Sequence, residues 1–458
     1  MEDMKNGKRS SFSGKLGYVL AAAGASVGLG NIWRFPYLAA KYGGGIFLII
    51  YIVLALTFGY TMIVAETAIG RMTRKSPVGA FKSFGKKKWL SFGGWINAVI
   101  PVLIVPYYSV IGGWVIKYLV EYFRGNAKLL AEDGYFTDFI SNGVSTELCF
   151  VAFCAFTLII IFAGVQNGIE RVSKIMMPIL IVLSVIIAVY SVTRPGALAG
   201  VKYFIVPNVK NFSWMTVVTA MGQMFYSLSI AMGILITFGS YMKKDTAIED
   251  STRNVEIFDT GIAIMAGLMI IPAVFAFSGG DPDTLQAGPS LMFITIPKVF
   301  QNMGFGTVIG IVFFVLVLFA AVTSSIALTE SAVSTFEDEL GWGRKKATVL
   351  VGVIMLALGS LSSLGYGPLA EIKIIGMQFL DLFDFLTNSV MMPIAALLTS
   401  LLVSRVVGID KIEEEIIHGE SAFRRKKVFV VMIKYLCPVF AIIILLSSVA
   451  NALGWIKM

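Results

Sequence analysis

Residues 20–38, LAAAGASVGLGNIWRFPYL, have the pattern of an apolar membrane-crossing helix that is interrupted halfway along its length. After the apolar start, glycines crowd together and are followed by polar, aromatic and proline residues: Gly24, Gly28, Gly30, Asn31, Trp33, Arg34 and Pro36. Lipid offers no hydrogen-bond partners, so non-helical backbone at membrane depth survives only where it lines a cavity. The break therefore predicts a binding site for an ion or a charged solute inside the membrane.

The composition is that of one large bundle of membrane helices. Of 458 residues, 57% are hydrophobic and only 14% are charged, whereas soluble chains carry about 25% charged residues. The mean hydropathy is +0.82. The net charge of +9 comes from basic residues in short loops between apolar segments, so it indicates membrane topology and not nucleic-acid binding. The expected surroundings of the chain are a lipid bilayer.

Eleven apolar segments approach or exceed the length of about 20 residues that crosses a bilayer. They lie at 16–38, 44–70, 92–122, 147–164, 172–193, 214–241, 257–277, 304–335, 347–364, 374–404 and 428–453. The expected organisation is an N-terminal tail, two five-span repeats, and a loop with the last span, at 1–15, 16–193, 194–404 and 405–458 respectively.

The charges of the loops predict the orientation of the chain in the membrane. With the N-terminus placed inside, most of the 37 Lys and Arg residues lie in the tail and in the loops on that side. Such an excess of basic residues is typical of cytoplasmic loops. We therefore expect a multi-pass protein of the cell membrane with a cytoplasmic N-terminus and, because the number of spans is odd, an extracellular C-terminus.

A second interrupted span occurs at 214–241, five spans after the first. Its apolar run is broken by small and polar residues: Gly222, Gln223, Ser227, Ser229 and Gly233. Two interrupted helices at corresponding places in two halves of a membrane protein indicate an inverted repeat with a binding site at the midplane. Since each half has five spans, the two halves face opposite ways.

Four motifs together resemble those of the neurotransmitter:sodium symporter family. They are NIWRFPY at 31–37, SLSIAMG at 227–233, Tyr107–Tyr108 in the third span and TSS at 323–325, and they occur in the family's order. The resemblance implies an all-α integral membrane protein with the LeuT-type fold, broken at spans 1 and 6. It is strongest to bacterial members that carry several hydrophobic amino acids. Many members have twelve spans, whereas this chain has eleven.

The resemblance implies two sodium sites, built from the oxygen ligands that a hard cation prefers. The first would use Ser26, Asn31, Ser227 and Asp259, and the second would use Gly24, Val27, Ala320, Thr323 and Ser324. The residues alone also allow other roles for these side chains. Hydroxyl groups in membrane helices often bond to their own backbone, and Asp259 would merely cap the seventh span if it lay at the membrane surface.

The same resemblance implies a pocket for an amino acid. Its carboxylate would lie between Gly28, Gly30 and Tyr108, near Ser26 and the first sodium ion. Its side chain would face a mainly apolar group: Ile104, Tyr226, Ser229, Met232 and Leu328. Amine-carrying relatives place an aspartate at the position of Gly28. Glycine at that position favours a substrate that brings its own carboxylate.

Two gates are also implied. On the extracellular side, Arg34 would pair with Asp384. This pair would close over the pocket together with Tyr108 and Tyr226. On the cytoplasmic side, Arg9 would pair with Asp338, with Ser240 and Tyr241 nearby and Phe12 as a plug. The alternative for Arg9 is a place in a solvated basic tail.

The predicted function is sodium-coupled symport of hydrophobic L-amino acids into the cell by alternating access, with two sodium ions. A carboxylate at Asp259 would make chloride unnecessary and would allow proton antiport on the return step. No nucleophile–base set or phosphate-binding loop is present, so an enzyme is not predicted, and neither is an obligatory protein partner. The alternatives are a proton-coupled or amine transporter of the same fold, or a channel or sensor built on it.

Overall fold

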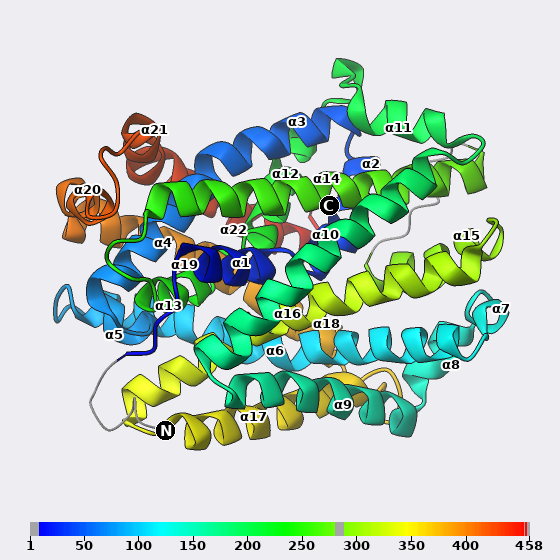
Figure 1. Cartoon of the computed structure of the whole chain (residues 1–458), viewed down its shortest axis with the longest axis horizontal. Helices are drawn as coiled ribbons and strands as arrows, with labels where there is room; N and C mark the ends of the chain where they lie inside the picture. Colours follow the sequence, from blue (N-terminus) through cyan, green and yellow to red (C-terminus); the bar gives the residue numbers. More distant parts are fainter. Residues whose placement is uncertain (1–8, 280–287, 453, 456–458) are drawn as a thin grey trace.

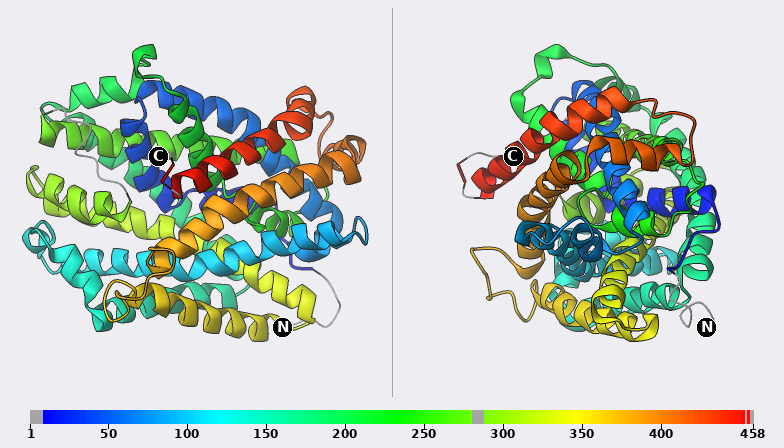
Figure 2. Two further views of the ribbon diagram at one scale, coloured as in Figure 1. Left: turned by 180° about the vertical axis from the view of Figure 1, so that it is seen from behind. Right: turned by 90° about the vertical axis from the view of Figure 1, so that its left-hand side faces the viewer.

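The computed structural model describes residues 9–279, 288–452 and 454–455. Most of the chain is helical, and the helices run roughly along the long axis of the molecule (Figure 1). Seen nearly along that axis, they form a closed bundle (Figure 2, right). Within the described residues, nine helical segments are long and apolar enough to cross a membrane.

The nine unbroken spans agree closely with the predicted ones. They are α3–α4 (Gly45–Thr73), α6 (Lys88–Phe123), α9 (Gly143–Phe162), α10 with its first turn (Val165–Val192), α14 (Ile248–Ser278), α16 (Gly306–Leu340), α17 (Arg344–Leu364), α18–α19 (Phe379–Val407) and α21–α22 (Lys426–Ala452). The largest difference is at α14, which begins at Ile248 and not at 257. Its added first turns contain Glu249 and Asp250, and acidic residues stabilise the N-terminal end of a helix.

The two predicted broken spans are confirmed as pairs of short helices. α1 (Lys15–Ser26) and the segment Gly30–Lys41, which ends in α2 (Phe35–Lys41), meet at an angle of 53°. α12 (Trp214–Ser227) and α13 (Ile234–Ser240) are separated by residues 228–233. By length and composition, the described residues hold nine unbroken candidate spans and, with the bent α1–α2 pair, up to ten, while α12 and α13 form a further interrupted segment at the predicted position.

The second break is built on left-handed backbone. Ser229, Ala231 and Gly233 have φ angles of 53°, 58° and 70°, and such angles are costly for residues other than glycine. Side-chain contacts to the first break hold this shape. The hydroxyl of Ser229 donates to the carbonyl oxygen of Ala25 at 2.9 Å, and that of Ser26 to the carbonyl oxygen of Leu228 at 3.3 Å. The two breaks therefore lie against each other in the middle of the bundle.

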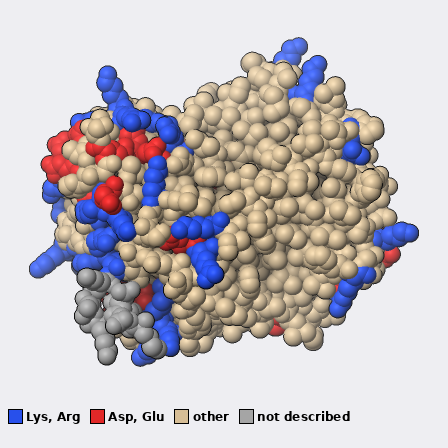
Figure 3. All heavy atoms as spheres, in the orientation of Figure 1, with Lys and Arg blue, Asp and Glu red and all other residues tan. Residues whose placement is uncertain are grey.

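Charged side chains are distributed as expected for a membrane protein. On the face shown in Figure 3 they gather toward the left end, and a few lie at the right-hand margin. A broad uncharged band separates the two groups. Exposed apolar side chains such as Ile159, Val182 and Val353 lie on the spanning helices, where lipid can cover them.

Candidate substrate and ion site

A small cavity of about 30 Å³ lies where the two breaks meet. All nine residues predicted to contact substrate line it, and so do four others; the full set is Ala25, Ser26, Gly28, Leu29, Gly30, Asn31, Ile104, Tyr108, Tyr226, Ser229, Met232, Ser324 and Leu328. Ala25 and Leu29 were not singled out from the sequence, because apolar residues inside a break carry no distinguishing signal. The lining is apolar on the side of Ile104 and Leu328 and polar at the break.

The glycines of the first break allow neighbouring side chains to approach its backbone. A Cβ atom on Gly30 would lie 2.3 Å from Cδ1 of Tyr226, so this ring packs directly on the glycine backbone. A Cβ atom on Gly28 would lie 2.7 Å from Oγ of Ser324 and 3.1 Å from the hydroxyl of Tyr108. That hydroxyl also accepts a hydrogen bond from the backbone N–H of Leu29 at 3.3 Å. Larger residues at either glycine would displace the walls of the cavity.

Four residues were predicted for the first sodium site, and the side chains of three of them contact one another in the structure. The side-chain amide of Asn31 donates to Oγ of Ser227 and to Oδ1 of Asp259, each at 2.8 Å, and Ser227 donates to the same carboxylate oxygen at 2.8 Å. Asp259 is fully buried and lies well inside α14, so it does not cap the helix. The fourth residue, Ser26, lines the cavity, and its hydroxyl also donates to the carbonyl oxygen of Ala22 at 3.1 Å.

Tyr51 completes this cluster and was not predicted from the sequence. Its hydroxyl donates to Oδ2 of Asp259 at 2.9 Å and to Oγ of Ser227 at 3.0 Å. The available signal was weak, since Tyr51 is the sole residue with a polar side chain in α3 (Gly45–Leu54). A buried tyrosine hydroxyl normally has a hydrogen-bond partner, which makes a lone tyrosine in an apolar span a candidate for such a cluster.

The predicted second sodium site surrounds Ser324. Its hydroxyl lies within 3.4 Å of three carbonyl oxygens of the first break, those of Gly24, Ala25 and Val27. One hydroxyl hydrogen cannot satisfy three acceptors, so this convergence of oxygen atoms is suited to a cation. Thr323 takes the alternative arrangement and donates to its own helix, to the carbonyl oxygens of Phe319 at 3.0 Å and Ala320 at 3.2 Å.

A buried carboxylate that was also not predicted supports the second break. Oε1 of Glu66, in α4 (Tyr60–Thr73), accepts the backbone N–H of Ala231 at 2.7 Å. Gln223 similarly supports the first break, because its side-chain amide donates to the carbonyl oxygen of Gly30 at 3.0 Å. A lone glutamate in the apolar run IVAETAIG was a detectable signal, since an acidic group inside a membrane is costly unless it is bonded.

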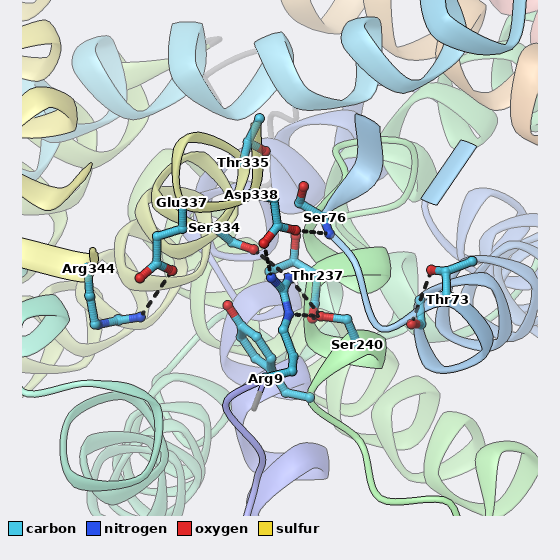
Figure 4. Close-up of polar contacts among 12 residues, drawn as sticks. Arg9, Thr73, Ser76, Thr237, Ser240, Ser334, Thr335, Glu337, Asp338 and Arg344 are labelled. Carbon is cyan, nitrogen blue, oxygen red and sulfur yellow. Dashed lines mark hydrogen bonds and ion pairs between the residues drawn. The ribbon is translucent and has the colours of Figure 1, made fainter. Parts of the chain in front are cut away.

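At the end of the bundle that carries Ser240 and Asp338, Arg9 is bonded to residues of two helices (Figure 4). Its guanidinium group donates to Oδ1 of Asp338 at 2.5 Å, to Oγ of Ser334 at 2.7 Å and to Oγ of Ser240 at 3.1 Å. The other oxygen of Asp338 accepts the backbone N–H of Ser76 at 2.6 Å. Arg9 is thus bonded to α13 and α16 and does not belong to a solvated tail. We call this cluster the Arg9 gate.

Phe12 fills the space behind the Arg9 gate. It is 1% exposed, and its ring packs edge-on against Tyr18, Phe238 and Tyr241. Its backbone N–H donates to the carbonyl oxygen of Tyr241 at 3.0 Å. The N-terminal segment therefore joins the halves of both broken spans that lie at this end.

We expect Arg9→Ala to open this end. Loss of about 1.4 kcal/mol of gate stability raises the open population about tenfold. The measurement is the rate of maleimide labelling of a cysteine at Thr237, a buried residue just inside the gate (Figure 4). Lys82→Ala is the matched control, because it removes an exposed pair with Glu339 at the same end and such pairs contribute little. Equal labelling rates in Arg9→Ala and the control would contradict the gate.

The opposite end holds a cavity of about 420 Å³, which we call the vestibule. Arg34 and Asp384 both line it, but the predicted ion pair between them is wrong for this conformation. Asp384 accepts from Asn388 at 2.5 Å and from Tyr107 at 3.2 Å. Arg34 lies 5.3 Å over the ring of Tyr226. Each group therefore has its own partner in this conformation, and Tyr226 lines both the vestibule and the small cavity.

Comparison with known proteins identifies the fold and the family. The model of the Sodium:neurotransmitter symporter family matches residues 9–130 and 136–455. The chain is 34% identical to the uncharacterized sodium-dependent transporter YhdH of Bacillus subtilis (strain 168), over 97% of this chain and 99% of the relative. It is 31% identical to an uncharacterized sodium-dependent transporter of Haemophilus influenzae, with 97% and 99% covered.

A solved structure has the same architecture. The crystal structure of MhsT in complex with L-phenylalanine aligns with a TM-score of 0.86 at 34% identity, covering 96% of this chain and 100% of that chain. The predicted LeuT-type membrane fold is confirmed by this likeness. The chain belongs to the sodium:neurotransmitter symporter family and is a sodium-dependent membrane transporter, not an enzyme.

Proposed function

We propose that this chain couples the entry of sodium ions to the uptake of hydrophobic L-amino acids. The observation that carries the proposal is the position of the small cavity, between apolar walls and the buried cluster of Asn31, Ser227 and Asp259. A hydrophobic amino acid fits both surroundings: its side chain can contact the apolar walls, and its charged amino and carboxylate groups can face the polar cluster. The structural neighbour MhsT was crystallised with such a molecule, L-phenylalanine.

The charge of the cavity supports a substrate that carries a carboxylate. None of the residues that line it in the described part of the chain is acidic, so an amine without a carboxylate would find no counter-charge there. An acidic side chain at Gly28 would press on the pocket wall, since its Cβ would lie 2.7 Å from Oγ of Ser324. The hydroxyl of Tyr108 and the positive end of the helix that begins at Gly30 would hold the substrate carboxylate.

Two sodium ions would travel with each substrate. The first would bind among Ser26, Asn31, Ser227 and Asp259, with the amide of Asn31 turned so that its oxygen faces the ion. The second would bind between the carbonyl oxygens of Gly24 and Val27 and the hydroxyl of Ser324, with Ala320 and Thr323 completing it. In each site, the broken helix supplies carbonyl oxygens that an unbroken helix would use internally.

Alternating access follows from the two ends of the molecule. The bonds of Arg9 across α13 and α16 at one end, together with the larger cavity at the other end, support a state that receives substrate from the vestibule side. We place the tail end in the cytoplasm and the vestibule outside, in agreement with the basic loops. On closing, Arg34 would leave Tyr226 and approach Asp384, while the Arg9 gate releases Phe12.

Asp259 would also set the ion requirement. A carboxylate beside the first sodium ion supplies a fixed negative charge, so chloride is not needed to balance the ion. After sodium leaves, burial of this carboxylate would favour its protonation. Proton antiport on the return step is therefore part of the proposal.

Competition between tryptophan and tryptamine tests the proposal in proteoliposomes containing the full chain. Uptake of labelled phenylalanine should require external sodium and fail with choline. Tryptamine should compete at least about a hundredfold more weakly than tryptophan, because it lacks the carboxylate and its charge-assisted hydrogen bonds. Equal competition by the two compounds would refute the carboxylate argument. Uptake driven by a proton gradient without sodium would favour a proton-coupled transporter, and non-saturating flux would favour a channel.

A further inference from the structure

A short arm with an unusual number of exposed apolar side chains connects the fifth span to the sixth. It comprises α11 (Ala197–Ile205) and residues 206–214. The exposed apolar side chains on this arm are Leu198, Ile205, Val206, Val209, Phe212 and Trp214. Val209 is 78% exposed and Trp214 is 80% exposed. A solvated loop would not normally present so many large apolar side chains to water.

The arm is firmly attached to the bundle, so this exposure does not reflect loose packing. The ring of Phe204 packs where a Cβ atom on Gly267 of α14 would lie, 2.2 Å from Cζ. The hydroxyl of Tyr203 donates to the carbonyl oxygen of Ala40 at 2.6 Å. Gly44 and Pro207 form an isolated antiparallel bridge. One face of the arm is thus fixed to α2, α3 and α14, and the opposite face is left uncovered.

The uncovered face points sideways from the bundle. In Figure 1, α11 runs along the upper edge, and the segment after it projects at the top, across the direction of the spanning helices. Both views of Figure 2 show the same sideways projection. The membrane normal follows the spanning helices, so the arm extends into the region where lipid surrounds the protein and not out into water beyond the end of the bundle.

The charges of the arm fit lipid headgroups. Lys202 and Lys210 are its charged residues, and no acidic residue occurs from 197 to 214. Trp214 begins α12, the first half of the sixth span, which places it where a span enters the membrane. Tryptophan and basic residues with flanking apolar groups are characteristic of the membrane–water interface. A second copy of the chain or a protein partner has no comparable feature in its favour here.

We propose that this arm is a membrane-interface anchor at the vestibule end. Val209, Phe212 and Trp214 enter the boundary between headgroups and acyl chains, and Lys202 and Lys210 contact lipid phosphates. The arm joins the vestibule-side halves of both broken spans, because it bonds to α2 and continues into α12. Closing the vestibule must move these halves, so the anchor makes the surrounding lipid a partner in that motion.

Spin labels on the arm test the proposal independently of substrate transport. Cysteines replace Val209 or Phe212 in the full chain, with Cys149, Cys154 and Cys437 changed to alanine, in vesicles of phosphatidylethanolamine and phosphatidylglycerol. Collision with oxygen, which concentrates in lipid, is compared with collision with a nickel chelate, which stays in water. The matched control is a label at Phe305, which is 82% exposed at the corner between α15 (Ile296–Gln301) and α16. Both elements meet at the right-hand end of the bundle in Figure 1, the end toward which α11 also lies.

The oxygen-to-nickel ratio should be at least about fivefold higher at 209 and 212 than at 305, because labels in the interface are shielded from water-soluble reagents. Ratios at 209 and 212 equal to the ratio at 305 would overturn the proposal and assign the arm to water. Protection from both reagents would also overturn it, because that result means that protein covers the arm. Two label positions guard against a local effect of one substitution.

Discussion

Replacing Gly30 with alanine should reduce sodium-dependent binding of phenylalanine by about tenfold to a hundredfold and reduce uptake at least as much. The added Cβ would lie 2.3 Å from Cδ1 and 2.4 Å from Cε1 of Tyr226, far inside van der Waals contact. Tyr226 lines both the small cavity and the vestibule, so its displacement distorts both. Overpacking of this kind costs about 1–3 kcal/mol, and each 1.4 kcal/mol corresponds to a factor of about ten in affinity.

Two further glycines make this experiment specific. Gly261 lies in α14, and an added Cβ there would meet no neighbouring atom within 4 Å. Gly261→Ala should therefore leave binding unchanged while slightly favouring the helix. Gly28→Ala should have a smaller effect than Gly30→Ala, because its nearest contact, Oγ of Ser324 at 2.7 Å, can rotate away. Wild-type binding in Gly30→Ala would show that the packing of Tyr226 on this glycine is not required.

The sequence predicted those parts of the site that lie in the two breaks, because the residue types of the breaks are themselves unusual in a membrane span. Glycines and polar residues in an otherwise apolar span have few explanations inside a membrane, and both breaks were located in this way. The neighbours of the breaks on other spans, such as Ile104 and Leu328, came from the family resemblance, since an apolar residue in an apolar span looks the same whether it faces lipid, protein or a cavity.

Other features depend on three-dimensional packing and could not be predicted. Tyr51 and Glu66 are distant in sequence from the residues that they bind, and their roles become visible only when α3 and α4 lie beside the breaks. The separation of Arg34 from Asp384 depends on which conformation is present. A sequence specifies both charges, but it does not state whether the vestibule between them is open.

The vestibule and the two breaks are connected through Tyr226. Arg34 lies over the ring of Tyr226, and Tyr226 packs on Gly30. The break that follows α12 is bonded to the last turn of α1 through Ser229 and Ala25. If the vestibule-side halves move, these contacts would carry the motion to the site where the proposed sodium ions bind, which is what coupling requires.

Replacing Asp259 with asparagine should convert chloride-independent uptake into chloride-dependent uptake. Asp259 is the single acidic residue of the Asn31–Ser227–Tyr51 cluster. A buried cation without a nearby negative charge is strongly disfavoured, so in Asp259→Asn a chloride ion must supply the missing charge. Uptake by the variant in gluconate should fall at least about tenfold below its uptake in chloride. The wild-type protein should transport equally well in both media.

The control for this prediction is Asp250→Asn on the same helix. Asp250 lies in the first turn of α14 and pairs with Lys15 and Arg253 at the surface, so its loss should leave uptake independent of chloride. Chloride dependence in the wild-type protein would show that Asp259 does not provide the balancing charge. Loss of uptake by Asp259→Asn in both media would contradict replacement by chloride, provided that the purified variant still binds phenylalanine in the presence of sodium. A return of activity with chloride alone would therefore identify charge, and not the shape of the carboxylate, as what Asp259 contributes to the first sodium site.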